Sequence, residues 1–261
     1  MASSATPTQE LPKMSLLQHL EELRKRIIIS VLAVIGGFLA CWWKADLIYG
    51  YMQRPITKVL TAHHLDSQLV YTAPTEPFNI YMKVGLIAGI FVASPIVLYQ
   101  LWLFISPGLF RNEKRYVLPF MFSTVLLFLA GGAFGYFMVY PAALKFLIEY
   151  PGDQFRPLIT VTEYTDLFLT IMLGLGIVFE MPIVIFFLAL MGIVDAGWLW
   201  RNLRYSILVI FIIAAIVTPT TDILNMCIFA APMIILYLFS IGVAWLVHPK
   251  RRKAREADKN A

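Results

Sequence analysis

The chain has few charged residues and no polar stretch long enough to form a separate soluble domain. Only 14% of its 261 residues are charged and 59% are hydrophobic, whereas soluble domains carry about 25% charged residues. The mean hydropathy is +0.74. This composition predicts an integral membrane protein. The net charge of +5 is therefore interpreted by its position along the chain, and we expect no nucleic-acid partner.

Catalytic and metal-binding motifs are also missing from the sequence. It contains no G-x-S-x-G, no H-E-x-x-H and no phosphate-binding P-loop. The two cysteines, Cys41 and Cys227, lie in apolar runs and fit neither a disulfide framework nor a metal motif. We therefore expect no enzymatic activity, no cofactor and no metal ion. Any work that the protein does must then draw on a partner or on a gradient.

What the sequence does contain is six continuous apolar runs. A membrane span needs roughly 20 apolar residues, and continuous rather than alternating hydrophobicity excludes barrel strands. The runs are Ile27–Trp43, Ile80–Ile105, Val117–Tyr140, Leu167–Val194, Tyr205–Val217 and Ile223–Val247. They predict an all-α integral membrane protein with six transmembrane helices, of which the fifth and sixth are short. Pro95 predicts a break in the second helix.

Basic residues are concentrated on one side of these runs. The segments between the runs lie alternately on the two sides of the membrane. Most of the 21 Lys and Arg residues fall in segments on the same side as the N-terminus, and only a minority lies in the loops on the other side. The positive-inside rule then places both termini in the cytoplasm. The sequence predicts a flexible tail over residues 1–13, a transmembrane domain over 14–247 and a disordered basic tail over 248–261.

Two short patterns concern helix ends and helix packing. Ser15 and Gln18 form a capping box, which predicts that the first helix begins before the membrane. Two G-x-x-x-G pairs, Gly85/Gly89 and Gly131/Gly135, predict close packing between helices.

One acid, Glu180, lies inside an apolar run, LGLGIVFEMPIVIFF. A charge at the bilayer centre costs about 2.5–3.5 kcal/mol on insertion scales. We expect Glu180 to be protonated, paired or facing a polar cavity. Two interpretations stay open: a buried, hydrogen-bonded neutral acid, or a functional polar site. The second includes a proton-coupled small-solute transporter that uses Glu180, although the inverted repeats expected of such a transporter are not visible.

Two further acids precede the first apolar run, in HLEELRKRIII. On a helix, Glu22 shares a side with His19 and Arg26, while Glu21 shares one with Arg24 and Lys25. Such local ion pairs stabilise a helix by about 0.2–0.5 kcal/mol each and require no further function. A third acid, Glu113, lies in FRNEKRY, the loop between the second and third runs. This loop is predicted to be on the same side of the membrane as Glu21 and Glu22. The residues alone do not decide whether these acids bind a ligand.

HLEELRKR (19–26) resembles the signature of the TatC family, the receptor subunits of the twin-arginine protein translocase. The resemblance extends in order from about residue 14 to 247. Its other segments are TAPTEPFNIYMK (72–83), ASPIVLYQLWLFISPGLFRNEKR (93–115), FGYFMVYP (134–141), FEMPI (179–183) and TPTTD (218–222).

The resemblance implies a concave six-helix protein in the inner membrane of a bacterium, with both termini cytoplasmic. It implies a receptor, not an enzyme, that recognises paired arginines in the signal peptides of folded proteins. It also implies transport driven by the proton-motive force. The implied partners are TatA- and TatB-type single-span subunits, further copies of the chain and membrane lipid.

Individual residues match family positions as well. Glu22 and Glu113 match the two signal-binding acids, whereas Glu21 falls at a variable position. Glu180 matches the buried acid of the family's fourth span. Neighbours of the signal-binding site are matched by Leu20, Leu23, Arg24, Phe104 and Pro107. Further family positions are matched by Pro55, Tyr136 and Asp222. Asn225-Met226 departs from the Ser-Gln of many members, which leaves the partner contact near the last two spans unassigned.

Overall fold

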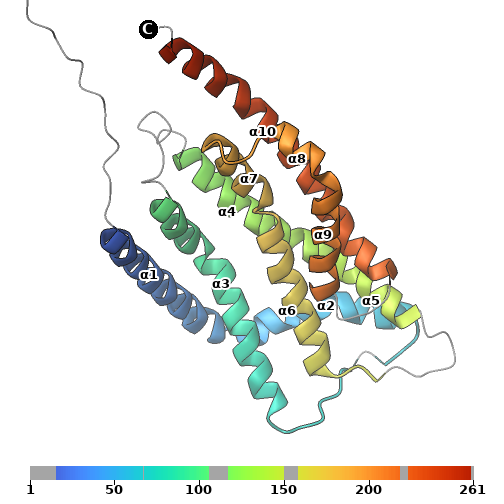
Figure 1. Cartoon of the computed structure of the whole chain (residues 1–261). Helices are drawn as coiled ribbons and strands as arrows, with labels where there is room; N and C mark the ends of the chain where they lie inside the picture. The colour runs from blue at the N-terminus through green and yellow to red at the C-terminus, as the bar shows by residue number, and fades with distance from the viewer. Residues whose placement is uncertain (1–15, 67, 106–116, 150–157, 218–222, 260–261) are drawn as a thin grey trace, which may run out of the picture.

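The structure is a computed structural model that describes residues 16–66, 68–105, 117–149, 158–217 and 223–259. The described part is almost entirely helical, with long helices packed side by side and one helix lying across their end (Figure 1). A single isolated β-bridge joins Val70 to Thr160 within these residues. The start of α1 and the end of α10 lie at the same end of the bundle (Figure 1).

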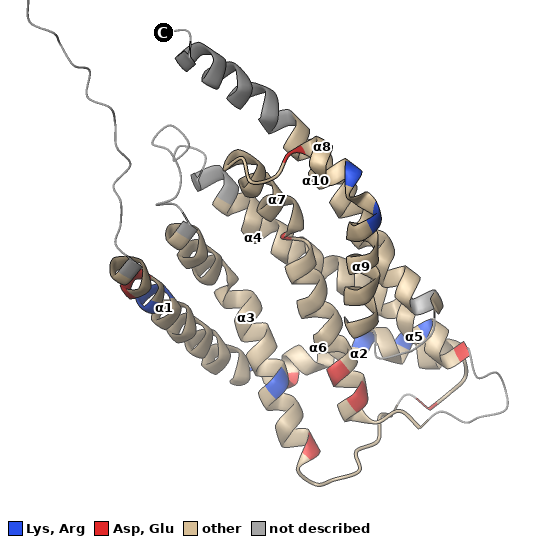
Figure 2. Ribbon diagram, in the orientation of Figure 1, with Lys and Arg blue, Asp and Glu red and all other residues tan. Residues whose placement is uncertain are grey.

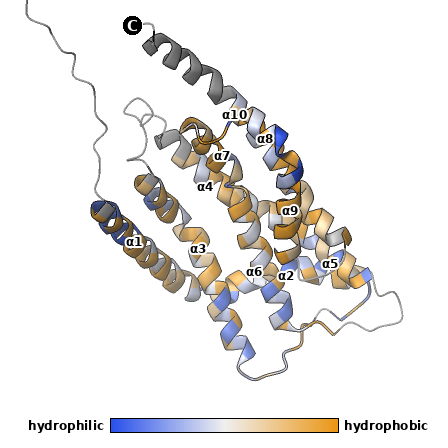
Figure 3. Cartoon of the chain, viewed as in Figure 1, coloured by the Kyte–Doolittle hydropathy of each residue, from blue (hydrophilic) through white to orange (hydrophobic). Residues whose placement is uncertain are grey.

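The helices match the six predicted apolar runs. Five helical segments are long and apolar enough to cross a membrane, and a sixth is shorter. They are Leu17–Trp42, Glu76–Phe104, Met121–Glu149, Val161–Leu190, Met226–Trp245 and the shorter Leu203–Ile216. Hydrophobic residues run along the middle of these helices, and hydrophilic ones gather near their ends (Figure 3). The expected all-helical membrane fold is confirmed.

The predicted lengths hold for some spans and not for others. α1 (Leu16–Trp42) begins ahead of its apolar run, as expected, and α9 (Leu203–Val217) is short, with 15 residues. The sixth span, Met226–Trp245, has 20 residues and is shorter than the other four long spans, but the helix that contains it, α10 (Ile223–Lys259), has 37 residues. It continues through residues that were expected to be disordered. Its last turns are rich in Ala, Lys, Arg and Glu, which favour helix.

The third and fourth spans are each interrupted. The third consists of α4 (Val117–Phe134), a π-helical turn η3 (Gly135–Val139) and α5 (Tyr140–Glu149). The fourth consists of α6 (Val161–Val178) and α7 (Met181–Leu190). Pro182 lies in the first turn of α7, where a missing N–H costs no helical hydrogen bond. A short helix, α8 (Ala196–Arg201), then leads to α9.

α2 (Ala45–Ala62) is a helix that the sequence analysis missed. That segment contains several charged residues, so its hydropathy predicts a loop between spans. Its buried side chains Met52, Ile56 and Leu60 recur every fourth residue and form one apolar stripe. α2 therefore lies across the end of the bundle, from the end of α1 towards α5, instead of crossing a membrane (Figure 1).

Tyrosine hydroxyls hold α2 on the bundle. Pro55 lies inside α2 and has no N–H to bond the carbonyl of Tyr51, four residues earlier. The hydroxyl of Tyr136 in η3 donates to that carbonyl instead, at 2.8 Å. The hydroxyl of Tyr164 in α6 donates to the next carbonyl, that of Met52. Two buried or half-buried tyrosines thus connect α2 to the third and fourth spans.

Pro95 does not break α3 (Glu76–Ile105), contrary to the sequence prediction. Proline at this position deprives the carbonyl of Phe91 of its helical partner. The hydroxyl of buried Ser94 donates to that carbonyl at 2.7 Å. The local replacement of the lost donor is consistent with a helix that continues for 30 residues.

Glycines bring two pairs of spans into backbone contact, as the G-x-x-x-G pairs predicted. A methyl group on Gly89 of α3 would lie 2.5 Å from the backbone nitrogen of Phe38 in α1. One on Gly131 of α4 would lie 2.5 Å from the carbonyl oxygen of Leu175 in α6. Both distances are shorter than atomic contact allows, so only glycine permits these close approaches.

Candidate functional site

A cluster of polar side chains joins the start of α1 to the end of α3. Figure 2 shows acidic and basic residues together at the start of α1. Arg26 donates from Nη2 to Oε1 of Glu22 at 3.1 Å, which confirms the predicted pairing of these two residues along the helix. The other terminal nitrogen, Nη1, donates to Oε1 of Gln100 in α3 at 3.0 Å. Arg26 therefore bridges Glu22 to a second helix.

An aromatic pair stands beside this bridge. The rings of His19 and Phe104 are stacked, with centroids 4.4 Å apart and planes 17° apart. His19 precedes Glu22 by one turn of α1, and Phe104 follows Gln100 by one turn of α3, so all these side chains lie on facing sides of the two helices. We call His19, Glu22, Arg26, Gln100 and Phe104 the α1–α3 cluster.

The cluster is only partly exposed and has unused hydrogen-bonding capacity. The side chains of Arg26 and Glu22 are 22% and 17% exposed. Oε2 of Glu22 and Nε of Arg26 are buried and have no hydrogen-bond partner among the described residues. A buried polar atom without a partner costs about 1–3 kcal/mol, more in a charged group. Glu22 thus has a carboxylate oxygen on which a further N–H donor would be stabilising.

The other predicted site residues are placed as follows. Leu23 is half-buried, whereas Leu20 and Arg24 are exposed. Glu21 is exposed and forms no ion pair with Arg24 or Lys25 in the described part of the chain, so the expected local pairing is not found. Glu113, Pro107 and Asp222 lie outside the described residues.

Sequence reasoning missed Gln100. It is 7% exposed and lies within the predicted apolar span Ile80–Ile105. The available signal was a single amide in LYQLWLF, one helical turn before the family-matched Phe104. A buried amide at the end of a span requires a polar partner, but the sequence does not show that this partner is Arg26.

Glu180 lies away from this cluster, at the junction of α6 and α7. Its Oε1 is buried and has no hydrogen-bond partner among the described residues. The helix that follows it packs against α3, where the rings of Phe187 and Trp102 lie 4.0 Å apart. Glu180 itself is half-buried at this junction, and its Oε1 is an unpaired polar atom there.

The structure explains two further matched positions. Pro55 and Tyr136 are far apart in the sequence, yet both act on the carbonyl of Tyr51: the proline leaves it without a donor and the tyrosine supplies one. The hydrogen bond from Tyr136 joins α2 to the third span.

The fold and the cluster together define a multi-span helical membrane protein with an acid-containing site at one end of the bundle. The family described as Sec-independent protein translocase protein (TatC) matches residues 18–232. The chain belongs to this family.

Relatives of the same name match over nearly the whole chain. The Sec-independent protein translocase protein TatC of Koribacter versatilis (strain Ellin345) is 71% identical over 252 residues, covering 96% of this chain and 93% of the relative. The TatC protein of Carboxydothermus hydrogenoformans is 38% identical over 237 residues, covering 91% of this chain and 95% of the relative.

Solved structures agree with these matches. A crystal structure described as the twin-arginine translocase receptor TatC superposes with a TM-score of 0.78 at 36% identity, covering 88% of this chain and 99% of that one. A second, in the detergent DDM, superposes with a TM-score of 0.79 at 36% identity, covering 87% and 99%. These similarities do not favour the small-solute transporter considered above.

Proposed function

We propose that this chain is the receptor of a twin-arginine translocation system in a bacterial inner membrane. In this proposal it binds the paired arginines of signal peptides on folded proteins, through Glu22 and Glu113. One observation carries the assignment of Glu22: its carboxylate is held by Arg26, while its second oxygen is buried and has no donor among the described residues. The membership of the chain in the TatC family supports the same function.

The chemistry of this site accounts for a preference for arginine over lysine. A guanidinium is a planar fork that can bond both oxygens of one carboxylate, whereas an ammonium group cannot match that geometry. Two acids would then each take one arginine. Glu22 is one of them. Glu113 follows α3, whose last turns carry Gln100 and Phe104, and we propose it as the second.

Arg26 would hold the site until a signal arrives. It neutralises Glu22 through one terminal nitrogen and is bonded to Gln100 through the other. An incoming arginine can replace Arg26 on Glu22 while Gln100 keeps Arg26 in place. The exchange leaves no buried guanidinium without a partner, which lowers its cost. The side chains of Glu22 and Arg26 are largely shielded from water, which strengthens charge-assisted bonds.

The rest of the signal and the partner proteins complete the proposal. We place the apolar segment of the signal along the bundle towards Glu180, and we expect TatA- and TatB-type subunits and further copies of this chain as partners. Transport draws on the proton-motive force. Both termini are proposed to face the cytoplasm, because basic residues concentrate there and because the start of α1 and the end of α10 share one end of the bundle.

Crosslinking of a twin-arginine peptide to variants tests the two acids. Glu22→Ala and Glu113→Ala should each lower the peptide affinity by about 10–100-fold, since a hydrogen bond to a charged group contributes about 1.5–3 kcal/mol. Glu21→Ala, which removes the neighbouring exposed acid, should have little effect and is the matched control. Undiminished crosslinking in both acid variants would contradict the assignment.

Export of a folded reporter with a twin-arginine signal, in a bacterium that lacks its own receptor, tests the function as a whole. The chain should restore export; a transporter of small solutes or a scaffold would not. The same assay examines Glu180. If its carboxylate takes part in the cycle, Glu180→Gln should lower export without lowering peptide crosslinking. Unaltered export would show that the charge of Glu180 is not needed.

A further inference from the structure

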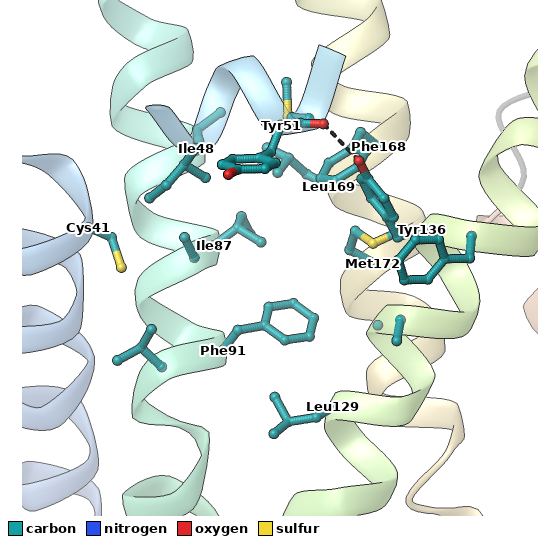
Figure 4. Close-up of a pocket in the computed structure, with 17 residues that line it drawn as sticks. Cys41, Ile48, Tyr51, Ile87, Phe91, Leu129, Tyr136, Phe168, Leu169 and Met172 are labelled. Atoms are coloured by element: carbon teal, nitrogen blue, oxygen red, sulfur yellow. Dashed lines mark hydrogen bonds between the residues drawn. The ribbon is translucent and has the colours of Figure 1, made fainter. Parts of the chain in front are cut away.

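An apolar pocket of about 480 Å³ lies beneath α2. Its walls come from the end of α1, from α2, α3 and α6, and from the junction of α4 with η3. Figure 4 shows side chains from these elements converging around the same space, with Tyr51 beneath α2 and Phe91 and Leu129 further along the bundle. We call this space the α2 pocket. Its lining is almost wholly aliphatic, aromatic and sulfur-containing.

The α2 pocket lies at the depth of the membrane spans. Lining residues such as Cys41, Phe91, Leu129 and Met172 belong to four of the segments that are long and apolar enough to cross a bilayer. The medium around such segments is hydrocarbon rather than water. An apolar pocket among such segments suits the acyl chain of a lipid.

A cation stands at the rim of the pocket, on α2. The guanidinium carbon of Arg54 lies 4.0 Å from the ring centroid of Tyr51, which lines the pocket. Stacking occupies the face of a guanidinium and leaves its N–H groups, which point outward in the plane, free for an oxyanion. Arg54 is exposed and has no carboxylate within ion-pair distance in the described part of the chain. A phosphate is the oxyanion that this fork suits.

We propose that the α2 pocket binds one phospholipid with a net negative headgroup. One acyl chain would fill the pocket, and the phosphate would bond Arg54 at its rim. The apolar lining and the cation one turn away on the same helix match the two chemically different ends of such a lipid. The inference does not depend on recognition of signal peptides by the α1–α3 cluster.

Native mass spectrometry of the purified full-length chain, reconstituted with lipids of equal chain length, tests the proposal. The wild type should retain phosphatidylglycerol several-fold more than zwitterionic phosphatidylcholine. Arg54→Gln should lower phosphatidylglycerol retention to the level of phosphatidylcholine. Lys145→Gln is the matched control, because it removes a cation from α5, which does not line the pocket, and it should leave the preference unchanged.

A second variant tests the pocket itself. Ala133 is exposed and lines the α2 pocket, so Ala133→Phe should occupy the space without disturbing the core and should lower retention of both lipids. Unchanged thermal unfolding would confirm that this variant is folded. Equal lipid retention in wild type, Arg54→Gln and Ala133→Phe would overturn the proposal. Crosslinks from a benzoylphenylalanine at position 133 to a protein helix rather than to phospholipid would also overturn it.

Discussion

At the scale of single residues, Pro55 in α2 and Pro95 in α3 lie inside helices without ending them. Each removes the donor for a carbonyl four residues earlier, and in each case a hydroxyl replaces it. Ser94 is the immediate neighbour of Pro95, and its hydroxyl donates to the carbonyl of Phe91. The hydroxyl of Tyr136, which belongs to a different span, donates to the carbonyl of Tyr51, which Pro55 leaves without a helical donor. The first replacement is local, whereas the second ties α2 to the bundle.

A double-mutant cycle tests this tie. Tyr136→Phe keeps the aromatic ring but removes the donor, so it should lower the free energy of unfolding by about 1–3 kcal/mol. In a Pro55→Ala background, residue 55 regains an N–H that can bond the carbonyl of Tyr51, and the cost of Tyr136→Phe should fall to near zero. Chemical or thermal unfolding in detergent measures both.

Tyr164→Phe is the control for this cycle. Its hydroxyl donates to the carbonyl of Met52, four residues before Ile56, which has an N–H in both backgrounds. Pro55→Ala should not rescue this variant. An equal cost of Tyr136→Phe with and without Pro55 would show that the proline and the tyrosine act independently.

At the scale of elements, the contact between α1 and α3 decides whether the α1–α3 cluster can form. Glu22 and Arg26 are on one helix and Gln100 is on the other, 74 positions from Arg26. These polar groups meet because the two helices pack closely further along, at Gly37 and Gly89. A shift of one helix along the other would separate Arg26 from Gln100.

Neighbouring glycines in α1 give a matched test of this packing. A methyl group on Gly37 would lie 2.5 Å from the carbonyl oxygen of Gly89, whereas one on Gly36 would meet nothing within 4 Å. Gly37→Ala should therefore destabilise the protein by about 1–3 kcal/mol, the usual cost of overpacking, and should weaken peptide crosslinking. Gly36→Ala should be neutral or stabilise by up to about 1 kcal/mol, because alanine favours helix.

Thermal unfolding and the crosslinking assay would compare the two variants side by side. If Gly37→Ala unfolds no more readily than Gly36→Ala, the close contact does not contribute to stability. If it unfolds more readily but binds the peptide as well as the wild type does, the contact stabilises the fold without positioning the site.

At the scale of the whole molecule, the spans differ greatly in length. α9 has 15 residues and is about 22 Å long at 1.5 Å per residue, less than the roughly 30 Å of a bilayer core. α3 has 30 residues and is about 45 Å long. Short spans thin the adjacent bilayer or are covered by neighbours. Several α9 side chains, among them Leu208 and Ile212, are exposed in the described part of the chain.

We therefore predict a bilayer thinned by several ångström beside α9. Spin labels at exposed positions along α9 report their depth in a bilayer through their accessibility to oxygen and to a polar relaxation agent. Labels near both ends of α9 should sit at the interfaces, and labels at matching depths on α3 provide the control. A full-thickness bilayer beside α9 would refute the prediction.

The sequence alone indicated that the protein lies in a lipid bilayer, and it located the six apolar helices. A continuous apolar run is stable in a bilayer core only as a helix, because hydrocarbon offers no partner to unpaired backbone N–H and C=O groups, so length and hydropathy suffice to locate spans. The helical pairing of Glu22 with Arg26 was also predictable, because residues four apart always meet on a helix. The family resemblance, and not these patterns, selected Glu22 rather than Glu21 as the candidate for binding.

Only the tertiary structure decided which side chains meet across helices. These contacts depend on how far each helix is rotated and shifted against the next. They are the hydrogen bond of Arg26 to Gln100, the hydrogen bond of Tyr136 to the carbonyl of Tyr51, and the stacking of His19 on Phe104. Hydropathy does not encode that, because an apolar helix can turn any side towards a neighbour at little cost in hydrocarbon. For the same reason α2 was missed: its burial depends on spans distant in sequence, which supply the surface under its apolar stripe.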